Sequence, residues 1–134
     1  MRSTTLHLTT GSDRITDTTD RCAAFAAEAG TDGLLNVFLP HATAGLALLE
    51  TGAGSDTDLA GHLDILLPRD DRWRHRHGSP GHGADHVLPA LIAPTLTIPV
   101  DQGTLALGTW QSIVIVDTNL DNPDRRLRLS FLEG

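Results

Sequence analysis

The sequence predicts a single α+β domain spanning residues 1–134, with a mainly antiparallel or mixed β-sheet packed against two to three short helices. Several segments alternate apolar and polar residues with the period of a strand, and only two or three show helical spacing. The strands come in runs rather than alternating strictly with helices, which is typical of α+β domains. A chain of 134 residues with 40% hydrophobic residues is also large and apolar enough to bury one core.

The first half of the chain contains three strand-like segments and one helix-like segment. Residues 3–10 alternate as a strand, and an Ala-rich helix follows over about 20–29. Gly30 is placed to end this helix in a left-handed conformation. Residues 34–39 form an apolar run typical of a buried strand, and we expect residues 45–49 to be its neighbour in the sheet.

The second half predicts two helices, separated by a long loop, and then four strands. A helix starting at Ser55 and ended by Pro68 carries a core-facing stripe of Leu59, Leu63, Leu66 and Leu67. Residues 69–85 read as a charged loop, and Asp85 is placed to cap a short helix from His86 to about Ala93. The strands that follow are expected over residues 95–100, from about 105 to 107, over 113–116 and over 126–132.

Composition narrows the classes of partner. The net charge is −7, all ten basic residues are arginine, and the chain has three Phe, two Trp and no Tyr. An acidic chain with few aromatic rings argues against a nucleic-acid or membrane partner. The absence of lysine excludes Schiff-base chemistry. Cys22 is the only cysteine, and neither a signal peptide nor a membrane span is recognisable, so we expect a cytoplasmic protein.

Histidines concentrate in one short stretch. His75, His77, His82 and His86 fall within twelve residues, in a chain that has seven histidines. Imidazole binds borderline metals and exchanges protons near neutral pH, so the stretch indicates a metal or proton-transfer site. The spacing matches no established metal motif, and a solvated polar loop is the alternative. In an extended segment His75 and His77 would point to opposite faces, so at most one of them is expected to face a site.

Polar residues also follow predicted strands at other points. His41 comes directly after a buried strand, and Glu50 comes after the next one. The pair could act as ligand or base and its partner, or as a turn histidine and a surface glutamate. The segment Gly108–Gln111 could be a structural bulge or a ligand-orienting turn, and Arg125–Arg126 could be an anion fork or a solvated turn.

Taken together, these motifs resemble the secondary thiamine-phosphate synthase family of YjbQ-like proteins, over nearly the whole chain. The resemblance rests on the run His41–Glu50, on Trp73-Arg74-His75 followed eleven residues later by His86, and on the segment from Leu96 to Gln111 with Arg125–Arg126. The Pro-Val…Gly…Gly-Thr-Trp-Gln run is its most specific part. Two departures are Leu49, where the family usually has Asn, and Leu88, where it usually has Lys or a polar residue.

The resemblance implies an α+β fold, a homotrimer, a pocket with the His/Glu constellation and a weak thiamine-phosphate synthase activity. Combining it with the residues, we expect His41, His75 and His86 to hold a divalent metal, with zinc favoured. Glu50 and Asp85 would act as general base or orient the imidazoles. A small phosphorylated substrate would be bound by Thr109, Trp110, Gln111 and Arg126. The alternatives are a metal-dependent phosphate-ester hydrolase and a non-catalytic trimer that binds a metal or small ligand.

Overall fold

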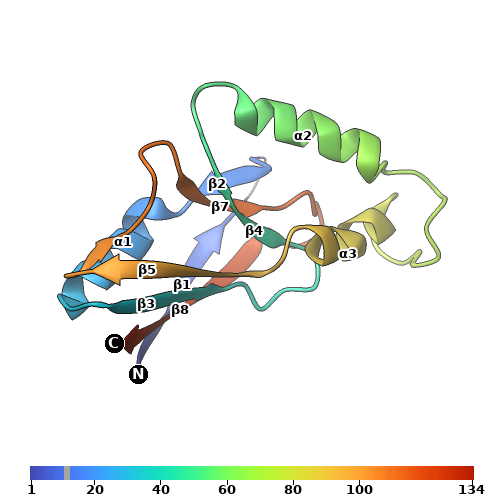
Figure 1. The fold of residues 1–134 in the computed structure, drawn as a ribbon. Helices are drawn as coiled ribbons and strands as arrows, with labels where there is room; N and C mark the ends of the chain where they lie inside the picture. The colour runs from blue at the N-terminus through green and yellow to red at the C-terminus, as the bar shows by residue number, and fades with distance from the viewer. Residues whose placement is uncertain (11–12) are drawn as a thin grey trace.

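Two antiparallel sheets and three helices make up the computed structural model, which describes residues 1–10 and 13–134 (Figure 1). The five-stranded sheet has the order β1 (Arg2–Thr9), β8 (Asp124–Glu133), β3 (Gly33–Phe38), β5 (Thr95–Asp101) and β6 (Thr104–Leu105). The three-stranded sheet has the order β2 (Ile15–Asp17), β7 (Ser112–Val116) and β4 (Gly45–Leu49). The helices are α1 (Thr19–Ala29), α2 (Ser55–Leu66) and α3 (His82–Leu91). The predicted α+β class is confirmed.

The main core lies between the two sheets and α1. It gathers the inward-facing residues of β3, β5 and β8, such as Leu35, Ile98 and Leu129, with Phe25 of α1. Alternation along each strand explains this, because every second side chain points to the same face of a sheet. Gly30 ends α1 with a φ of 67°, and its N–H donates to the carbonyl oxygen of Ala26, as predicted.

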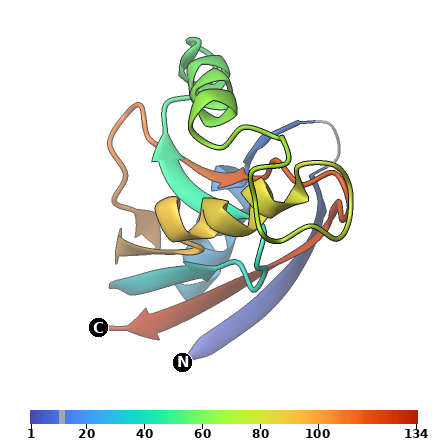
Figure 2. The ribbon, with the colours of Figure 1, turned by 90° about the vertical axis from the view of Figure 1, so that its right-hand side faces the viewer.

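Strand β7 is buried on both faces, which explains its continuous apolar sequence. Ile113 and Ile115 point into the main core, whereas Val114 and Val116 belong to a second cluster. That cluster is completed from α2 and α3 by residues that include Leu63, Leu67, Ala84 and Leu88. Both helices therefore lie over the outer face of the three-stranded sheet, and the segment joining them forms one end of the molecule (Figures 1 and 2).

Four expectations are corrected by the structure. β4 does not pair with β3 but with β7 of the other sheet, because the chain crosses between the sheets after Phe38. The three-residue strand β2 was not predicted. Leu66 is 62% exposed rather than part of the core-facing stripe. Helix α3 begins at His82 and not at His86, so Asp85 lies inside the helix instead of capping it, and so does Pro89.

Within the described residues, no helix has the length and hydropathy required to cross a membrane.

Candidate functional site

The early start of α3 places two histidines on one helical face. His82 and His86 are four residues apart, a spacing that brings side chains together on an α-helix. Their Nε2 atoms lie 3.0 Å apart. His82 is buried, with 7% of its surface exposed, whereas His86 is half-buried. The helix therefore presents two imidazole nitrogens to the same small volume.

The segment before α3 adds a third imidazole and a fourth ring beside it. The centroid of the His75 ring lies 3.9 Å from that of His86 and 5.5 Å from that of His82. One ring nitrogen from each of these three residues lies within 4.8 Å of the others, and the buried His75 Nε2 has no hydrogen-bond partner. The exposed His77 ring lies 4.0 Å from the His75 ring but is not part of this group, in line with the expectation that at most one of the two faces the site.

A glycine in the first turn of α3 allows this close approach. A Cβ on Gly83 would lie 2.3 Å from the Cβ of Trp73 and 2.6 Å from the carbonyl oxygen of His75. The His75 backbone therefore packs directly on the helix that carries His82 and His86. Trp73 is held in turn by its indole N–H, which donates to the carbonyl oxygen of Pro68 at 2.8 Å.

Replacing Gly83 with alanine should destabilise the protein by about 1–3 kcal/mol, because the added methyl group overlaps backbone and side-chain atoms. Chemical denaturation measures this change. Gly61 is the matched control, since it lies in α2 and a Cβ there would meet no atom within 4 Å. Gly61→Ala should stabilise the protein by about 0.5–1 kcal/mol, the usual gain in helix propensity. Equal effects of the two substitutions would contradict this packing.

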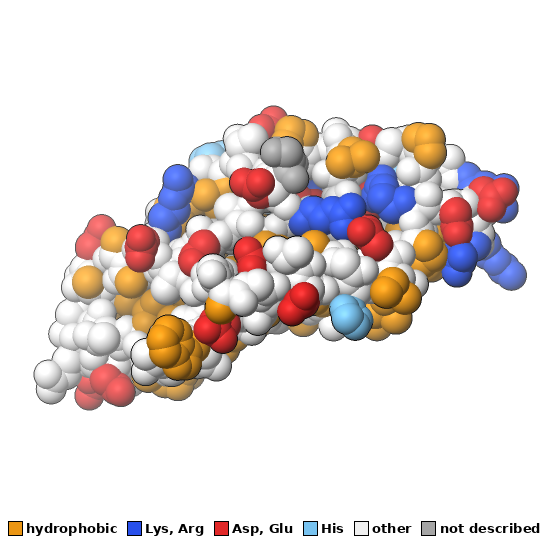
Figure 3. All heavy atoms as spheres, turned by 90° about the horizontal axis from the view of Figure 1, so that it is seen from above, with side chains coloured by type: hydrophobic (Ala, Val, Ile, Leu, Met, Phe, Trp, Pro, Cys, Tyr) orange, Lys and Arg blue, Asp and Glu red, His pale blue; other side chains and the backbone are white. Residues whose placement is uncertain are grey.

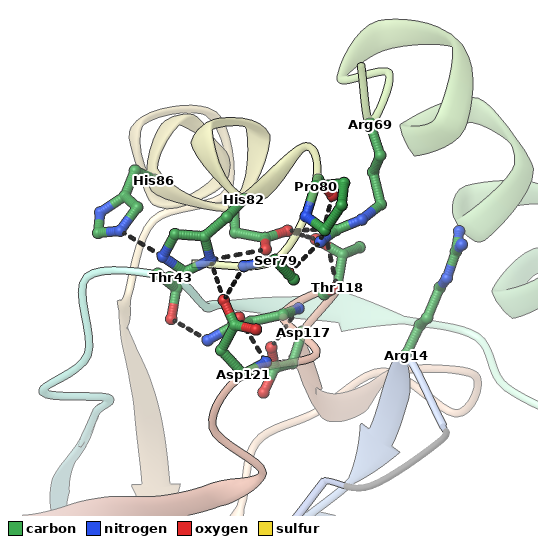
Figure 4. A network of polar contacts seen from close by, with 12 residues as sticks. Arg14, Thr43, Arg69, Ser79, Pro80, His82, His86, Asp117, Thr118 and Asp121 are labelled. Carbon is green, nitrogen blue, oxygen red and sulfur yellow. Dashed lines mark hydrogen bonds and ion pairs between the residues drawn. The ribbon is translucent and has the colours of Figure 1, made fainter. Parts of the chain in front are cut away.

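Two carboxylates stand behind His82 (Figure 4). Asp85 is fully buried, and its Oδ1 accepts hydrogen bonds from Arg69 Nη1 at 2.5 Å and Thr118 Oγ1 at 2.7 Å. Its Oδ2 has no partner with hydrogen-bond geometry and lies 3.4 Å from His82 Nδ1. Asp121 Oδ2 lies 2.9 Å from the same Nδ1, although not in hydrogen-bond alignment. Negative charge thus faces the side of the His82 ring that points away from His86.

The segment after β7, which carries Thr118 and Asp121, is held in place by a buried polar network. Asp117 and Arg125 form an ion pair at 2.7 Å, and the side chains of both are about 1% exposed. Asp117 also accepts hydrogen bonds from Thr10 Oγ1 at 2.8 Å and from the Asn119 backbone N–H at 3.0 Å. Thr118 and Asp121 lie in the same segment, so this buried network positions the polar groups that contact Asp85 and His82.

Burial and the neighbouring rings lower the pKa of two of the three imidazoles, which favours their neutral form. Burial, followed by the neighbouring rings of His77 and His82, lowers the pKa of His75 below its ordinary value. Burial, followed by the neighbouring histidines, likewise lowers the pKa of His86, against an opposing effect of Asp85. The pKa of Asp121 is lowered mainly by the hydrogen bond from the Ser79 backbone N–H. Three imidazoles with carboxylates behind one of them match the donor set of a zinc-type site.

A hollow of about 390 Å³ opens beside His75 and His82. It could admit a small molecule to the fourth coordination position of an ion held there. Its lining includes an aromatic ring, a hydroxyl, charged groups and two of the histidines, namely Trp73, Ser79, Arg76, Asp71, His75 and His82.

Within one chain, His41 lies apart from His75, His82 and His86. Its Nε2 accepts a hydrogen bond from the Arg126 backbone N–H at 2.8 Å, and both residues line a second hollow, of about 420 Å³. Among the described residues, the group able to hold one ion consists of His75, His82 and His86, so a single chain does not assemble the expected set of His41 with His75 and His86. The reason is that β3 ends in one sheet and α3 packs on the other.

The environment of His41 makes a testable prediction about pH. Burial, and then the charges of Arg125 and Arg126, lower its pKa below 6.5. Because the folded protein binds a proton at His41 less readily than the unfolded chain does, protonation of His41 favours unfolding. The free energy of unfolding should therefore be unaffected by His41 above pH 6.5 and should decrease as the pH falls below it. NMR titration of the ring should give a pKa below 6.5 that rises in Arg126→Gln. A pKa unaffected by that substitution would contradict the electrostatic cause.

Four of the remaining expected site residues lie at the opposite end of the three-stranded sheet. Leu49 pairs with Ser112, and Thr51 contacts Ser112 through their hydroxyl oxygens at 3.5 Å, so Glu50 lies near the segment Thr109–Gln111. Ser112 begins β7, whereas Thr118 and Asp121 of the histidine site follow its other end. Within one chain, Glu50, Thr109, Trp110 and Gln111 are therefore grouped together but not with the histidine site. Arg126 is exposed and lies in the hollow that contains His41.

The sequence analysis named His82 in the histidine stretch without assigning it a role, and it did not name Arg69, Thr118 and Asp121. The signal for His82 was its spacing of four from His86, which acquires meaning only once the helix is known to start early. Thr118 and Asp121 belong to the polar run Asp117–Asp121, which follows the buried strand β7. The strand-end argument applied to His41 and Glu50 would have found this run. Nothing in the sequence distinguishes Arg69 from the other arginines.

Comparisons with known proteins agree with one another. The family model described as "UPF0047 protein YjbQ-like" matches residues 4–134. A UPF0047 protein of Mycobacterium tuberculosis is 61% identical over 134 residues, which is 100% of both chains. A UPF0047 protein of Archaeoglobus fulgidus is 32% identical over 112 residues, covering 84% of this chain and 82% of the relative.

Two solved structures are similar over almost the full length. A hypothetical protein of Aeropyrum pernix matches with a TM-score of 0.88 and 28% identity, covering 100% of both chains. A YbjQ-like protein of unknown function from Sulfolobus solfataricus has a TM-score of 0.91, covers 99% of this chain and 97% of its own, and at 21% identity shows the fold alone. On the match to the family model and to these relatives, the chain belongs to the YjbQ-like UPF0047 family.

Proposed function

We propose that the protein binds a divalent metal, zinc in preference, through His75, His82 and His86, and uses it to act on a small phosphorylated molecule. The observation that carries the proposal is the convergence of three imidazole nitrogens within 4.8 Å, one of them the buried and unpartnered Nε2 of His75. A buried polar atom without a partner is costly unless a ligand satisfies it. Three imidazole ligands also leave one position free in a tetrahedral site, as catalytic zinc sites do.

Each neighbouring residue has a role in this proposal. An ion bound here would supply Lewis acidity toward a phosphate oxygen. Asp85 and Asp121 would orient His82 through its Nδ1, because a carboxylate behind a ligating imidazole fixes the ring and raises its basicity. The full burial of Asp85 favours this orienting role over direct contact with a substrate. Arg76 and Ser79 line the adjacent hollow, where they could contact a phosphate.

The reaction proposed is of the thiamine-phosphate synthase type, at a low rate. In it, the carbon–oxygen bond from a pyrimidine methylene group to pyrophosphate breaks as a bond to the thiazole nitrogen forms. The support lies in the family resemblance and in a site suited to stabilising the charge on a departing pyrophosphate. A hydrolytic reaction in the same site would use water in place of the thiazole.

Metal content tests the first part of the proposal. Elemental analysis of the purified protein should find about one zinc per chain, bound as a four-coordinate site with one open position. His86→Ala should lose the metal, whereas His62→Ala should keep it, because His62 is an exposed residue of α2. If the wild-type protein also contained no metal after incubation with excess zinc, the proposed site would be refuted.

Product analysis tests the second part. The metal-loaded protein should form thiamine phosphate and pyrophosphate when both substrates are present, and His86→Ala should not. Phosphate or pyrophosphate released without the thiazole phosphate would replace this reaction with hydrolysis. If the protein bound the metal but formed neither thiamine phosphate nor a hydrolysis product, the proposed transferase activity would be refuted and a metal-binding role would remain.

A further inference from the structure

Arg69 is half-buried, although arginine is usually a surface residue. Several arginine side chains of this chain lie on its surface, as Figure 3 shows for one face, whereas the side chain of Arg69 is 19% exposed. Its backbone packs on Gly81, where a Cβ would lie 2.5 Å from the Arg69 Cα. Arg69 is therefore fixed against the residue that directly precedes α3.

The guanidinium of Arg69 joins three segments of the chain (Figure 4). Its Nη1 donates to Asp85 Oδ1 of α3 at 2.5 Å and to the Thr118 carbonyl oxygen, after β7, at 3.2 Å. Its Nη2 donates to Ser79 Oγ at 3.3 Å and to the Pro80 carbonyl oxygen at 3.5 Å, in the segment before α3. A guanidinium is planar and offers its donors in fixed directions, so these contacts set the position of the Asp85 carboxylate.

These contacts make the two oxygens of Asp85 unequal. Oδ1 accepts from Arg69 and from the Thr118 hydroxyl. Among the described residues, neither Oδ2 nor His82 Nδ1 has a hydrogen-bond partner, although both atoms are buried and lie 3.4 Å apart. A carboxylate only accepts hydrogen bonds, so a proton on Nδ1 is the arrangement that suits both atoms, and it leaves the lone pair of the neutral ring on Nε2. Asp121 Oδ2, at 2.9 Å from the same Nδ1, favours the same tautomer.

We propose that Arg69 is a positioning residue of the histidine site. By holding Asp85 Oδ1, it turns Oδ2 toward His82 and so keeps the lone pair of His82 Nε2 available to an ion. This Nε2 is the atom that lies 3.0 Å from Nε2 of His86. Arg69 acts through Asp85 and contacts neither the ion nor a substrate. The inference deepens the proposed function, on which it rests for the ion that the site holds.

An asparagine at position 85 turns the selection by Arg69 against metal binding. The amide has one oxygen that accepts and one nitrogen that donates, whereas Arg69 only donates. In Asp85→Asn, Arg69 should therefore hold the amide oxygen and leave the NH₂ group facing His82 Nδ1. That group favours the tautomer with the proton on Nε2, which blocks the lone pair. We expect zinc affinity to fall by about 10–100-fold, the range seen when an orienting partner is lost.

Removing Arg69 from this variant should restore part of the affinity. In Arg69→Met with Asp85→Asn, the amide can turn its oxygen to His82 Nδ1 and its nitrogen to the Thr118 hydroxyl, which accepts as well as donates. Competition with a chromophoric chelator should show zinc binding tighter than in Asp85→Asn by about 3–10-fold, half of the loss on a logarithmic scale. The double variant buries no unpaired charge, so we expect it to fold, which circular dichroism checks.

Two further variants separate positioning from the charge of Arg69. Arg69→Met alone should weaken zinc binding, because Asp85 loses the contact that orients it. The same substitution thus lowers the affinity with Asp at position 85 and raises it with Asn there, whereas simple repulsion between Arg69 and the ion would give a gain in both. Arg74→Met with Asp85→Asn is the matched control, since Arg74 is an exposed arginine of the same segment, and it should bind zinc as weakly as Asp85→Asn.

The outcomes distinguish this inference from the proposed function. If the wild type binds zinc but the double variant binds it no more tightly than Asp85→Asn, the metal site stands and the role of Arg69 is overturned. If the wild type binds no zinc, the metal site fails, and NMR of the ring nitrogens of His82 in the ion-free protein then decides. The proton should lie on Nδ1 in the wild type, on Nε2 in Asp85→Asn and on Nδ1 again in the double variant. The same tautomer in all three proteins would refute the positioning by Arg69.

Discussion

Replacing His82 with alanine should weaken zinc binding by at least about 100-fold, the upper part of the range seen when only an orienting partner is lost. The substitution removes one of three converging nitrogens and also leaves Asp85 and Asp121 facing a cavity. Competition with a chromophoric chelator measures the affinity. His41→Ala is the matched control and should bind zinc as the wild type does, because His41 lies in a separate hollow.

The reverse result would restore the ligand set expected from sequence. If His41→Ala lost zinc while His82→Ala retained it, His41 would have to reach the site in a way that one chain does not provide. The pH dependence supplies a second check. Protons compete with zinc for imidazole, and the pKa values of His75 and His86 lie below 6.5. Protonation of these two ligands should therefore cost little affinity above that pH, and the affinity should fall in more acidic solution.

The alternation of apolar residues was sufficient to find most strands, because a half-buried strand leaves a period of two in the sequence. It was not sufficient to divide them between sheets. Gly33–Phe38 and Gly45–Leu49 are separated by six residues, which is compatible with a hairpin, but each strand pairs elsewhere. The pattern shows which face of a strand is buried and carries little information about its partners.

The sequence identified the segment that carries the candidate site but not which of its histidines converge. The density of histidines identified the segment from His75 to His86, but the start of α3 decided which of them converge. Gly81 and Gly83 disfavour a helix by intrinsic propensity. In the fold, Gly83 is required because Trp73 and His75 leave no room for a Cβ. Tertiary packing thus overrides the local preference, and with it comes the pairing of His82 with His86.

The other half of the site depends on contacts across long sequence separations. Asp121 reaches His82 from 39 residues further along the chain, and Thr118 reaches Asp85 from 33 residues away. Such contacts follow from the position of β7 under α3, which no local pattern reveals. The contact of Asp85 with His82 is local by contrast, since the two residues are three apart on α3, but it depends on the early start of that helix.

Replacing Asp117 with alanine should have the largest effect on stability, about 3–5 kcal/mol, because it leaves the guanidinium of Arg125 buried without its counter-charge. Arg125 is 2% exposed, and its Nε and Nη2 both donate to Asp117, at 2.7 and 3.0 Å. Urea denaturation measures the loss. Asp70→Ala is the control and should change stability little, because the ion pair of Asp70 with Arg72 is exposed to solvent.

A double variant shows whether the buried charge itself is the cause. Asp117→Leu with Arg125→Met removes both partners, so it should be more stable than Asp117→Ala, since no charge is left unpaired. It should still bind zinc more weakly than the wild type, because Asp117 also accepts the Asn119 N–H and so orders the segment that brings Thr118 and Asp121 to the site. A double variant as unstable as Asp117→Ala would mean that the lost hydrogen bonds of Thr10 and Asn119, rather than the charge of Arg125, dominate the energetics of this network.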